Sequence, residues 1–485
     1  MNHLVLMLAL PLLAAFLLPV AARVSVLAGR LMGPLVLAVN VVLGLQAWDV
    51  VANGAVVIEL GGFRPPFGIV FYIDQLALLF AIAVSAGCFL LWPLQDGEET
   101  PVREYTLTLV LAAAATGLAL SADLFNIYVF YELTAVASYG LAAARGTSAG
   151  YAAVMRYAVI SSLGAGLMLV GIALVYMAAG TLNLAQLSQL ASGTLDGPLG
   201  LAAFVFMLIG AGVKAELFPV NTWVPEVYGT TSKRVAGLLA GLVSKLALLI
   251  ILRLLVLVFH QPEALQLMLV LGVLGVLSGE LAAWRARDLT RMLAYSSIGQ
   301  LGIIFIAFSM PGEAALFAGL AVALHHLLVK PALFLLAHRW GASIDRLAGA
   351  ARSNPLAGAL FVLLALSLVG VPPLPGFWAK LLVLIELAGQ QQPLYYFAAL
   401  AILTGAVLEA NYLFRVVGTL YRRPAEPPLP AVHRVPDIAA AGVLGGALVA
   451  CMLMLTPVTE QLDGIAARAA DAALIVETVN PGERP

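Results

Sequence analysis

The feature that most constrains this chain is a series of about fourteen apolar runs, each close to the length of a membrane-crossing helix. A helix needs about 20 apolar residues to span the hydrocarbon core. Inside lipid every backbone polar group needs an internal partner, so such segments fold as helices. The runs are centred near residues 3–22, 29–50, 73–93, 106–121, 123–144, 156–179, 199–218, 236–258, 264–283, 289–309, 313–336, 356–372 with 376–390, 394–420 and 437–456. We therefore predict an all-α polytopic membrane protein.

The composition supports this interpretation and excludes several other classes. Of the 485 residues, 62% are hydrophobic and 11% are charged, whereas a soluble domain carries roughly 25% charged residues. A net charge of −1 argues against a nucleic-acid binder that works by bulk charge. Cys88 and Cys451 both lie in apolar runs, which argues against a disulfide framework or a thiolate metal cluster.

Positive charge predicts the orientation of the spans, because cytoplasmic loops are enriched in Lys and Arg. Of the 25 basic residues, sixteen lie in loops after odd-numbered spans and six lie inside spans. The other three, which follow even-numbered spans or lie in the tail, are Arg64, Arg468 and Arg484. Both termini are therefore expected outside. Arg23 and Arg30 follow the first run, which favours a retained span over a cleaved signal peptide.

The segments outside the spans are small. Residues 55–72 alternate in polarity and contain Gly61-Gly62, a pattern that predicts a β-hairpin on the outside. The tail after Pro457 has apolar residues at helical spacing and is expected to lie along the surface.

A shift of about 165 residues brings two parts of the chain into register. Asp123-Leu124 then matches Asp288-Leu289, and Lys214 falls beside Lys380, each near a proline break that contains a tryptophan. The shift equals five spans, an odd number, so the copies are expected to be inverted, as in secondary transporters. The predicted parts are spans 1–3 with the hairpin (1–105), two inverted five-helix repeats (106–258 and 264–422), with spans 7 and 12 broken, and the last span with its tail (437–485).

The charged residues inside the spans are the candidate functional residues, because an ionisable group at the bilayer centre costs at least about 2.5–3.5 kcal/mol. Glu132 lies nine residues past Asp123, or about 13 Å along a helix, close to the midplane. Lys214 precedes the Pro219 break by about one turn. We expect Glu132 and Lys214 to form an ion pair, and the alternative is a pair that only locks two helices.

Four further residues are candidate proton carriers. Lys245 lies deep in span eight without an obvious local acid, and Lys380 follows the second break. Burial disfavours the charged form of a lysine, so its proton becomes exchangeable. His325 and His326 lie in the middle of span eleven, and histidine titrates near neutral pH. Adjacent residues point about 100° apart on a helix, so one of the two is expected to face the path.

Other polar residues in the spans carry weaker expectations. Arg253 lies towards the outer end of span eight and is either functional or extended to the interface. Glu409 and Arg415 are expected to pair with each other or to line an exit, Ser161 and Ser162 to hold water, and Lys330 to support the helix at Pro331. No nucleotide, haem, Fe–S or metal motif is present, so no cofactor is expected.

These segments resemble the antiporter-like subunit family shared by respiratory complex I, membrane-bound hydrogenases and multisubunit Mrp-type Na+/H+ antiporters. The resemblance rests on DLFNIYVFYE (123–132), VKAELFPVNTWVPEVY (213–228), RDLTRMLAYSSIGQLG (287–302), HHLLVKPALF (325–334) and VPPLPGFWAK (371–380). It implies a midplane proton path whose matching residues here are Glu132, Lys214, Lys245, His325 or His326, and Lys380. The hairpin GGFRPPFGI and the tail EQLDGIAARAADAAL look most like the D-type subunits of the Mrp antiporters.

The resemblance implies a proton-translocating subunit in the plasma membrane, assembled with other membrane subunits and exchanging Na+ for protons. Lys380 argues against the complex I type of subunit that has glutamate there. The alternative is a proton-pumping subunit of a complex I or hydrogenase type redox complex. A third possibility is a scaffold subunit whose channel is inactive.

Overall fold

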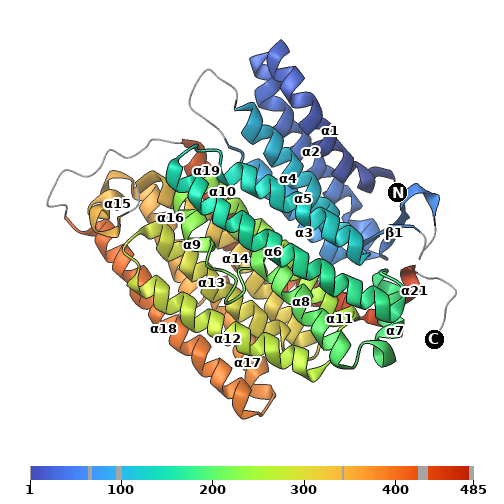
Figure 1. Ribbon diagram of the computed structural model, residues 1–485. Helices are drawn as coiled ribbons and strands as arrows, with labels where there is room; N and C mark the ends of the chain where they lie inside the picture. The colour runs from blue at the N-terminus through green and yellow to red at the C-terminus, as the bar shows by residue number, and fades with distance from the viewer. Residues whose placement is uncertain (1, 64–67, 94–100, 341–342, 424–434, 480–485) are drawn as a thin grey trace. The chain divides into compact units, whose positions relative to one another are not determined.

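The computed structural model describes residues 2–63, 68–93, 101–340, 343–423 and 435–479 (Figure 1). Within these ranges the regular elements are helices and one two-stranded sheet. It divides into two compact units, and each is described by itself. Unit 1 comprises Met1–Ala215, Leu242–Ala264 and Ala467–Pro485, and unit 2 comprises Glu216–Gly241 and Leu265–Ala466.

Unit 1 contains the first six spans. In it α6 packs along α8, and α1 packs against both α2 and α4. The elements are α1 (Asn2–Val24), α2 (Val26–Ala52), β1 (Val56–Glu59), η1 (Leu60–Gly62), β2 (Val70–Ile73), α3 (Gln75–Leu90), α4 (Val102–Leu120), α5 (Leu124–Ala142), α6 (Ser148–Ala179), α7 (Leu184–Thr194), α8 (Pro198–Lys214), α11 (Ser244–Leu257) and α21 (Ala472–Val479).

Unit 2 is organised around α14, which packs against α10, α13, α16, α17 and α19. A π-helical turn, η2 (Leu239–Val243), follows α10 and leads into α11 of unit 1. The elements of unit 2 are α9 (Val224–Thr230), α10 (Lys233–Leu238), α12 (Pro262–Arg285), α13 (Leu289–Phe308), α14 (Glu313–Trp340), η3 (Ile344–Leu347), α15 (Ala350–Ser353), α16 (Pro355–Val369), α17 (Pro375–Gly389), α18 (Pro393–Tyr421), α19 (Val435–Leu453) and α20 (Leu455–Ala470).

The predicted spans all correspond to helices. In the described residues, nine helices are long and apolar enough to cross a membrane, and α3, α8 and α16 are shorter apolar helices. Predicted span seven is α8 followed by the short α9, and span twelve is α16 followed by α17. Span eight is α10 and α11, joined by the π turn. The fold class is therefore confirmed: an all-α polytopic membrane protein with its seventh and twelfth spans interrupted.

The order of elements repeats along the chain, and so do the caps. The Asp123 carboxylate accepts hydrogen bonds from the backbone N–H groups of Phe125 and Asn126 and so caps α5. Asp288 caps α13 in the same way. Short β-bridges also join Asp123 to Asn183 and Asp288 to Ser343. Each copy of the repeat thus begins its second helix at an aspartate that pairs with the segment after its third helix.

The predicted hairpin is present. β1 and β2 pair antiparallel, with Val56 opposite Ile73 and Glu59 opposite Val70. Gly61 and Gly62 have φ values of 72° and 76° in the turn, a conformation that a residue with a Cβ rarely adopts. The tail is helical as predicted, and α21 packs against α7 within unit 1.

Candidate functional site

A first group of charged side chains lies in unit 1, at the point where α8 ends. Lys214 is the last residue of α8 and is 2% exposed. Its Nζ lies 3.9 Å from Glu132 Oε1 and 3.5 Å from Ser161 Oγ. It also lies 3.1 Å from the centroid of the Tyr131 ring, where a cation is attracted to the π face. The predicted proximity of Glu132 and Lys214 is therefore present.

Close helix packing positions this group. A Cβ added at Gly210 of α8 would lie 2.6 Å from the carbonyl oxygen of Gly164 on α6, so the two backbones meet there. This approach brings Ser161, one turn earlier on α6, to Lys214. The Tyr131 hydroxyl donates a 2.5 Å hydrogen bond to the Gly210 carbonyl and ties α5 to the same place.

Lys245 is fully buried near the start of α11, directly after the π turn. Its Nζ donates a 3.0 Å hydrogen bond to Ser244 Oγ. A π turn leaves part of the helical hydrogen-bond ladder out of register and is frequent at functional sites. The sequence predicted the depth of Lys245 but gave no indication of this turn.

A second group lies in unit 2, where α16 gives way to α17. Lys380 Nζ lies 2.5 Å from Glu409 Oε2 on α18 and donates a 2.7 Å hydrogen bond to the Leu368 carbonyl. That carbonyl is accessible because α16 ends at Val369. The Gln300 amide donates to both carboxylate oxygens of Glu409, at 2.9 and 3.1 Å. The pair is buried, with the Glu409 side chain 1% exposed.

The two histidines of α14 face different neighbours. His325 Nε2 lies 2.9 Å from Ser367 Oγ on α16, and His326 Nε2 lies 3.4 Å from Ser297 Oγ on α13. Ser367 Oγ also accepts from the Gly376 N–H, across the helix break. His325 therefore lies at the break that precedes Lys380, and His326 lies on the α13 side.

The sequence reasoning missed one buried charged group and understated another. Glu280 on α12 is 2% exposed and accepts a 2.9 Å hydrogen bond from the Tyr412 hydroxyl. Lys330 is fully buried and donates to Ser296 Oγ at 2.6 Å and to the Leu293 carbonyl at 3.2 Å. Glu280 could have been found from the sequence, because it is an isolated acid near the end of an apolar run.

One alternative in each of two weaker expectations is wrong. Arg253 does not extend to the interface: it is 8% exposed, and its Nη2 lies 2.5 Å from Asp74 Oδ2 at the start of α3. Burial, reinforced by the charge of Asp74, raises the pKa of the neighbouring Tyr72 phenol above its ordinary value. Glu409 does not pair with Arg415, because Lys380 takes the carboxylate and Arg415 donates to the Ala286 carbonyl.

Broken membrane helices with buried acid–base pairs define the class of this protein as a transporter-type membrane subunit. The chain belongs to the family described as NADH:quinone oxidoreductase/Mrp antiporter, transmembrane, which matches residues 121–408. It is 34% identical over 378 residues to NADH-quinone oxidoreductase subunit N of Desulforudis audaxviator, covering 75% of this chain and 74% of the relative. It is 33% identical over 372 residues to the D subunit of the Na(+)/H(+) antiporter of Alkalihalophilus pseudofirmus, covering 74% and 75%.

Solved structures agree with this family. A chain of the membrane-bound sulfane sulfur reductase, an archaeal respiratory membrane complex, matches with a TM-score of 0.91 at 28% identity, covering 99% of this chain and all of that one. A chain of the Mrp complex from Dietzia sp. DQ12-45-1b matches with a TM-score of 0.87 at 25% identity, covering 99% of each chain. The resemblance to D-type antiporter subunits is thus confirmed, and relatives from respiratory complexes are similar at nearly the same identity.

Proposed function

We propose that this chain is the proton-translocating subunit of a multisubunit Na+/H+ antiporter. The observation that best supports the proposal is a lysine–glutamate pair at each of the two helix breaks. Lys214 pairs with Glu132 in unit 1, and Lys380 pairs with Glu409 in unit 2. Isolated charges of this kind are costly inside a membrane, and their repetition at both breaks favours a transport role over a locking one.

In this proposal the protons are carried near the middle of the membrane by the side chains that the sequence singled out. These are Glu132, Lys214, Lys245, His325 or His326, and Lys380. We add Glu409 as the partner of Lys380. A lysine beside a carboxylate is held as the ammonium ion, and it releases its proton when that carboxylate is compensated by another positive charge. The glutamates thus control when each lysine releases its proton.

Serine hydroxyls support this role, because a hydroxyl both donates and accepts a hydrogen bond. Lys214, Lys245 and Lys330 lie within 3.5 Å of Ser161, Ser244 and Ser296 respectively. The two histidines contact Ser367 and Ser297. Each of these basic groups therefore has a neighbour through which a proton can be passed, directly or with water.

We propose the remaining features on the basis of the relatives and the charge pattern. The relative from Alkalihalophilus pseudofirmus belongs by name to a Na(+)/H(+) antiporter, so this chain assembles with other membrane subunits and serves Na+ exchange. The enrichment of basic residues in loops after odd-numbered spans supports an orientation in the plasma membrane with both termini outside. The two five-span segments, 106–258 and 264–422, are the functional repeats.

A second function is favoured by the relatives from respiratory complexes. The Desulforudis audaxviator relative is a subunit of an NADH-quinone oxidoreductase. In such a complex this chain would pump protons with energy that its partners obtain from a redox reaction. Purification of the native complex separates the two functions, because flavin and Fe–S absorbance in stoichiometric amount would support the redox complex and overturn the antiporter.

The direct test measures Na+-dependent proton movement in everted membrane vesicles that contain the whole complex. Lys214→Ala should abolish the pH response to added Na+, while Lys233→Ala, which changes a half-buried lysine that donates to the Tyr228 and Gly229 carbonyls at the end of α9, should keep it. Both variants must assemble to the same level, as judged by co-purification of the partner subunits. Normal exchange by assembled Lys214→Ala would support the scaffold hypothesis and overturn the proposal.

A further inference from the structure

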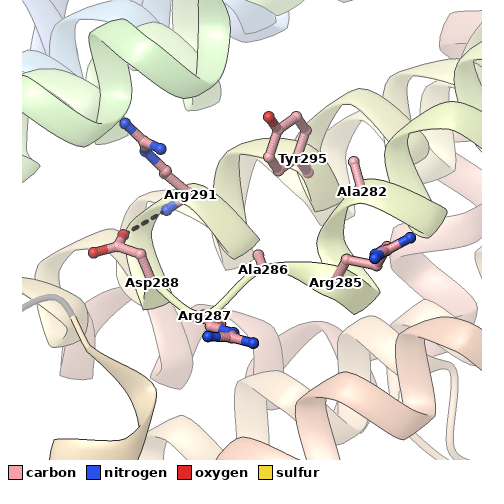
Figure 2. Close-up of a pocket in the computed structure, with 7 residues that line it drawn as sticks. All are labelled: Ala282, Arg285, Ala286, Arg287, Asp288, Arg291 and Tyr295. Carbon is pink, nitrogen blue, oxygen red and sulfur yellow. Dashed lines mark hydrogen bonds between the residues drawn. The ribbon is translucent and has the colours of Figure 1, made fainter.

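A cavity of about 430 Å³ lies in unit 2 where α12 ends and α13 begins (Figure 2). It is far along the sequence from the helix breaks and takes no part in the proposed proton path. Its lining is dominated by three arginines from one short stretch of the chain, with smaller residues between them. The lining residues are Ala282, Arg285, Ala286, Arg287, Asp288, Arg291 and Tyr295.

The three guanidinium groups are exposed and unpaired. Among the residues that the structure describes, Arg285, Arg287 and Arg291 form no ion pair. The one acid in the lining, Asp288, caps α13 by accepting from the backbone N–H of Arg291. Arg415 adds a further positive charge, because it donates to the Ala286 carbonyl that lines the cavity. Among the described residues, the arginines at the cavity therefore outnumber its one carboxylate, and the cavity carries an excess of positive charge.

An apolar strip on α12 leads to this cavity. Val270, Leu274, Leu281 and Trp284 are each between 40 and 49% exposed and follow one another at one- and two-turn spacing. Trp284 donates from its indole to Asn411 and directly precedes Arg285. Tryptophan is enriched where the acyl region of a bilayer meets its headgroups. The strip thus forms an exposed apolar surface on α12, and this surface ends at the positively charged cavity.

We propose that this cavity binds the phosphate headgroup of an anionic phospholipid, with an acyl chain lying along the exposed face of α12. Guanidinium groups bind phosphate oxygens through paired charge-assisted hydrogen bonds. Basic pockets between transmembrane helices on the cytoplasmic side bind anionic headgroups, and the loop after span nine is expected on that side. The apolar strip distinguishes a lipid from free phosphate or an acidic peptide, since neither of those would cover it. The inference depends on the membrane location of the chain and not on the proton path.

The test compares two triple variants of the assembled complex. Arg285→Gln, Arg287→Gln and Arg291→Gln together neutralise the cavity. The matched control changes Arg346, Arg352 and Arg422 to Gln, three exposed arginines of unit 2 that do not line it. Each complex is delipidated, given phosphatidylglycerol or phosphatidylcholine, and assayed by native mass spectrometry. Because each basic residue contributes about 1 kcal/mol, or about fivefold in affinity, the cavity variant should bind phosphatidylglycerol about 100-fold more weakly.

The proposal requires that the wild type and the control prefer phosphatidylglycerol to phosphatidylcholine, and that inorganic phosphate does not displace the lipid. Equal lipid binding by the cavity variant would overturn it, and so would displacement by inorganic phosphate. The remaining alternative is that a partner protein occupies the cavity, and a photoreactive residue at position 282 tests it. An adduct with lipid supports the proposal, and an adduct with a partner protein contradicts it. These outcomes do not depend on antiport activity, so they stand apart from the test of the proposed function.

Discussion

Lys380 Nζ lies 2.5 Å from Glu409 Oε2, whereas the corresponding lysine of the first repeat, Lys214, lies 3.9 Å from Glu132. The two pairs also differ in access to solvent or lipid, because the Glu132 side chain is 32% exposed and that of Glu409 is 1% exposed. The first pair is therefore the longer one and its glutamate is partly exposed, whereas its lysine and both members of the second pair are buried. This difference leads us to expect separate roles for the two pairs in proton transfer.

Removal of the Glu409 carboxylate should affect both stability and transport. Glu409→Gln leaves Lys380 buried without its counter-charge, and loss of one member of a buried pair costs about 3–5 kcal/mol. We expect lower thermal stability and loss of antiport in vesicles. Glu386→Gln is the matched control, because it changes a carboxylate on α17 that does not contact Lys380. A Glu409→Gln complex with wild-type stability and exchange would contradict the importance of the pair.

Exchanging the two charges separates a structural pair from a functional one. Lys380→Glu combined with Glu409→Lys restores the attraction between α17 and α18, so thermal stability should recover relative to either single variant. Antiport should not recover, because the proton-carrying amine no longer lies at the carbonyls that α16 leaves free. The comparison uses melting temperature and Na+-dependent proton movement at matched expression. Recovery of both quantities would show that the pair only holds the helices together.

Glu132→Gln should reduce exchange more than it reduces stability. The 3.9 Å separation and the 32% exposure of Glu132 predict a smaller loss of stability than in Glu409→Gln, although the buried Lys214 is again left without its counter-charge. Exchange should nevertheless collapse, because Lys214 then lies beside a neutral amide and has no carboxylate to control proton release. Glu263→Gln, on the exposed first turn of α12, is the control. Near-normal exchange by Glu132→Gln would assign a structural role to the pair.

Much of this fold could be predicted, because every helix that crosses a membrane must meet the same requirements of length, apolar composition and internal hydrogen bonding. The lengths of the apolar runs determined the spans, and Pro219 and Pro372 marked the two interruptions between α8 and α9 and between α16 and α17. The match of Asp123 with Asp288 also predicted the repeated starts of α5 and α13. Each of these features depends on local sequence alone.

Apart from Lys214 and Glu132, the partners of the buried charges could not be predicted, because they depend on how helices rotate and pack. Glu409 was matched with Arg415 since they are close in sequence, yet its partner Lys380 is 29 residues away. Arg253 pairs with Asp74, 179 residues away. Glu280 could have been predicted as a buried group, because it is an isolated acid in an apolar run, the same signal that singled out Glu132.

The inverted repeat can be tested by labelling two positions that correspond under the shift of about 165 residues. Arg145 lies between α5 and α6, and Pro311 lies between α13 and α14. If the copies are inverted, cysteines at these positions should react with an impermeant thiol reagent from opposite sides, Arg145→Cys only from the cytoplasm. The background replaces Cys88 and Cys451, the two native cysteines. Labelling of both positions from the same side would exclude the inversion.

The Arg253–Asp74 pair should behave as a structural contact. Asp74→Asn keeps an oxygen that can cap α3 at Ala77 but removes the charge that balances Arg253. We expect the melting temperature to fall, with exchange per assembled complex unchanged. The double variant Arg253→Met with Asp74→Asn should be more stable than Asp74→Asn alone, because no buried charge is left unpaired. A specific loss of exchange in stable complexes would instead place Arg253 in the transport path.

The prediction that most directly concerns proton transfer compares two substitutions at Lys245. This lysine is fully buried and donates to Ser244, so it can act either as a fixed charge or as a group that binds and releases a proton. Lys245→Ala removes the group altogether. Lys245→Arg keeps a positive charge, but an arginine does not release its proton under physiological conditions.

A proton carrier should fail with both substitutions, whereas a lysine that only supplies charge should tolerate arginine better than alanine. We therefore expect loss of Na+-dependent proton movement of about tenfold or more in both variants, equivalent to at least about 1.4 kcal/mol. Lys330 provides the comparison, since it bonds Ser296 and the Leu293 carbonyl beside Pro331, and its substitutions should have milder effects. The measurement uses everted vesicles with matched amounts of assembled complex. Substantial exchange by Lys245→Arg would show that this position needs only a charge, and Lys245 would then have to be removed from the proposed proton path.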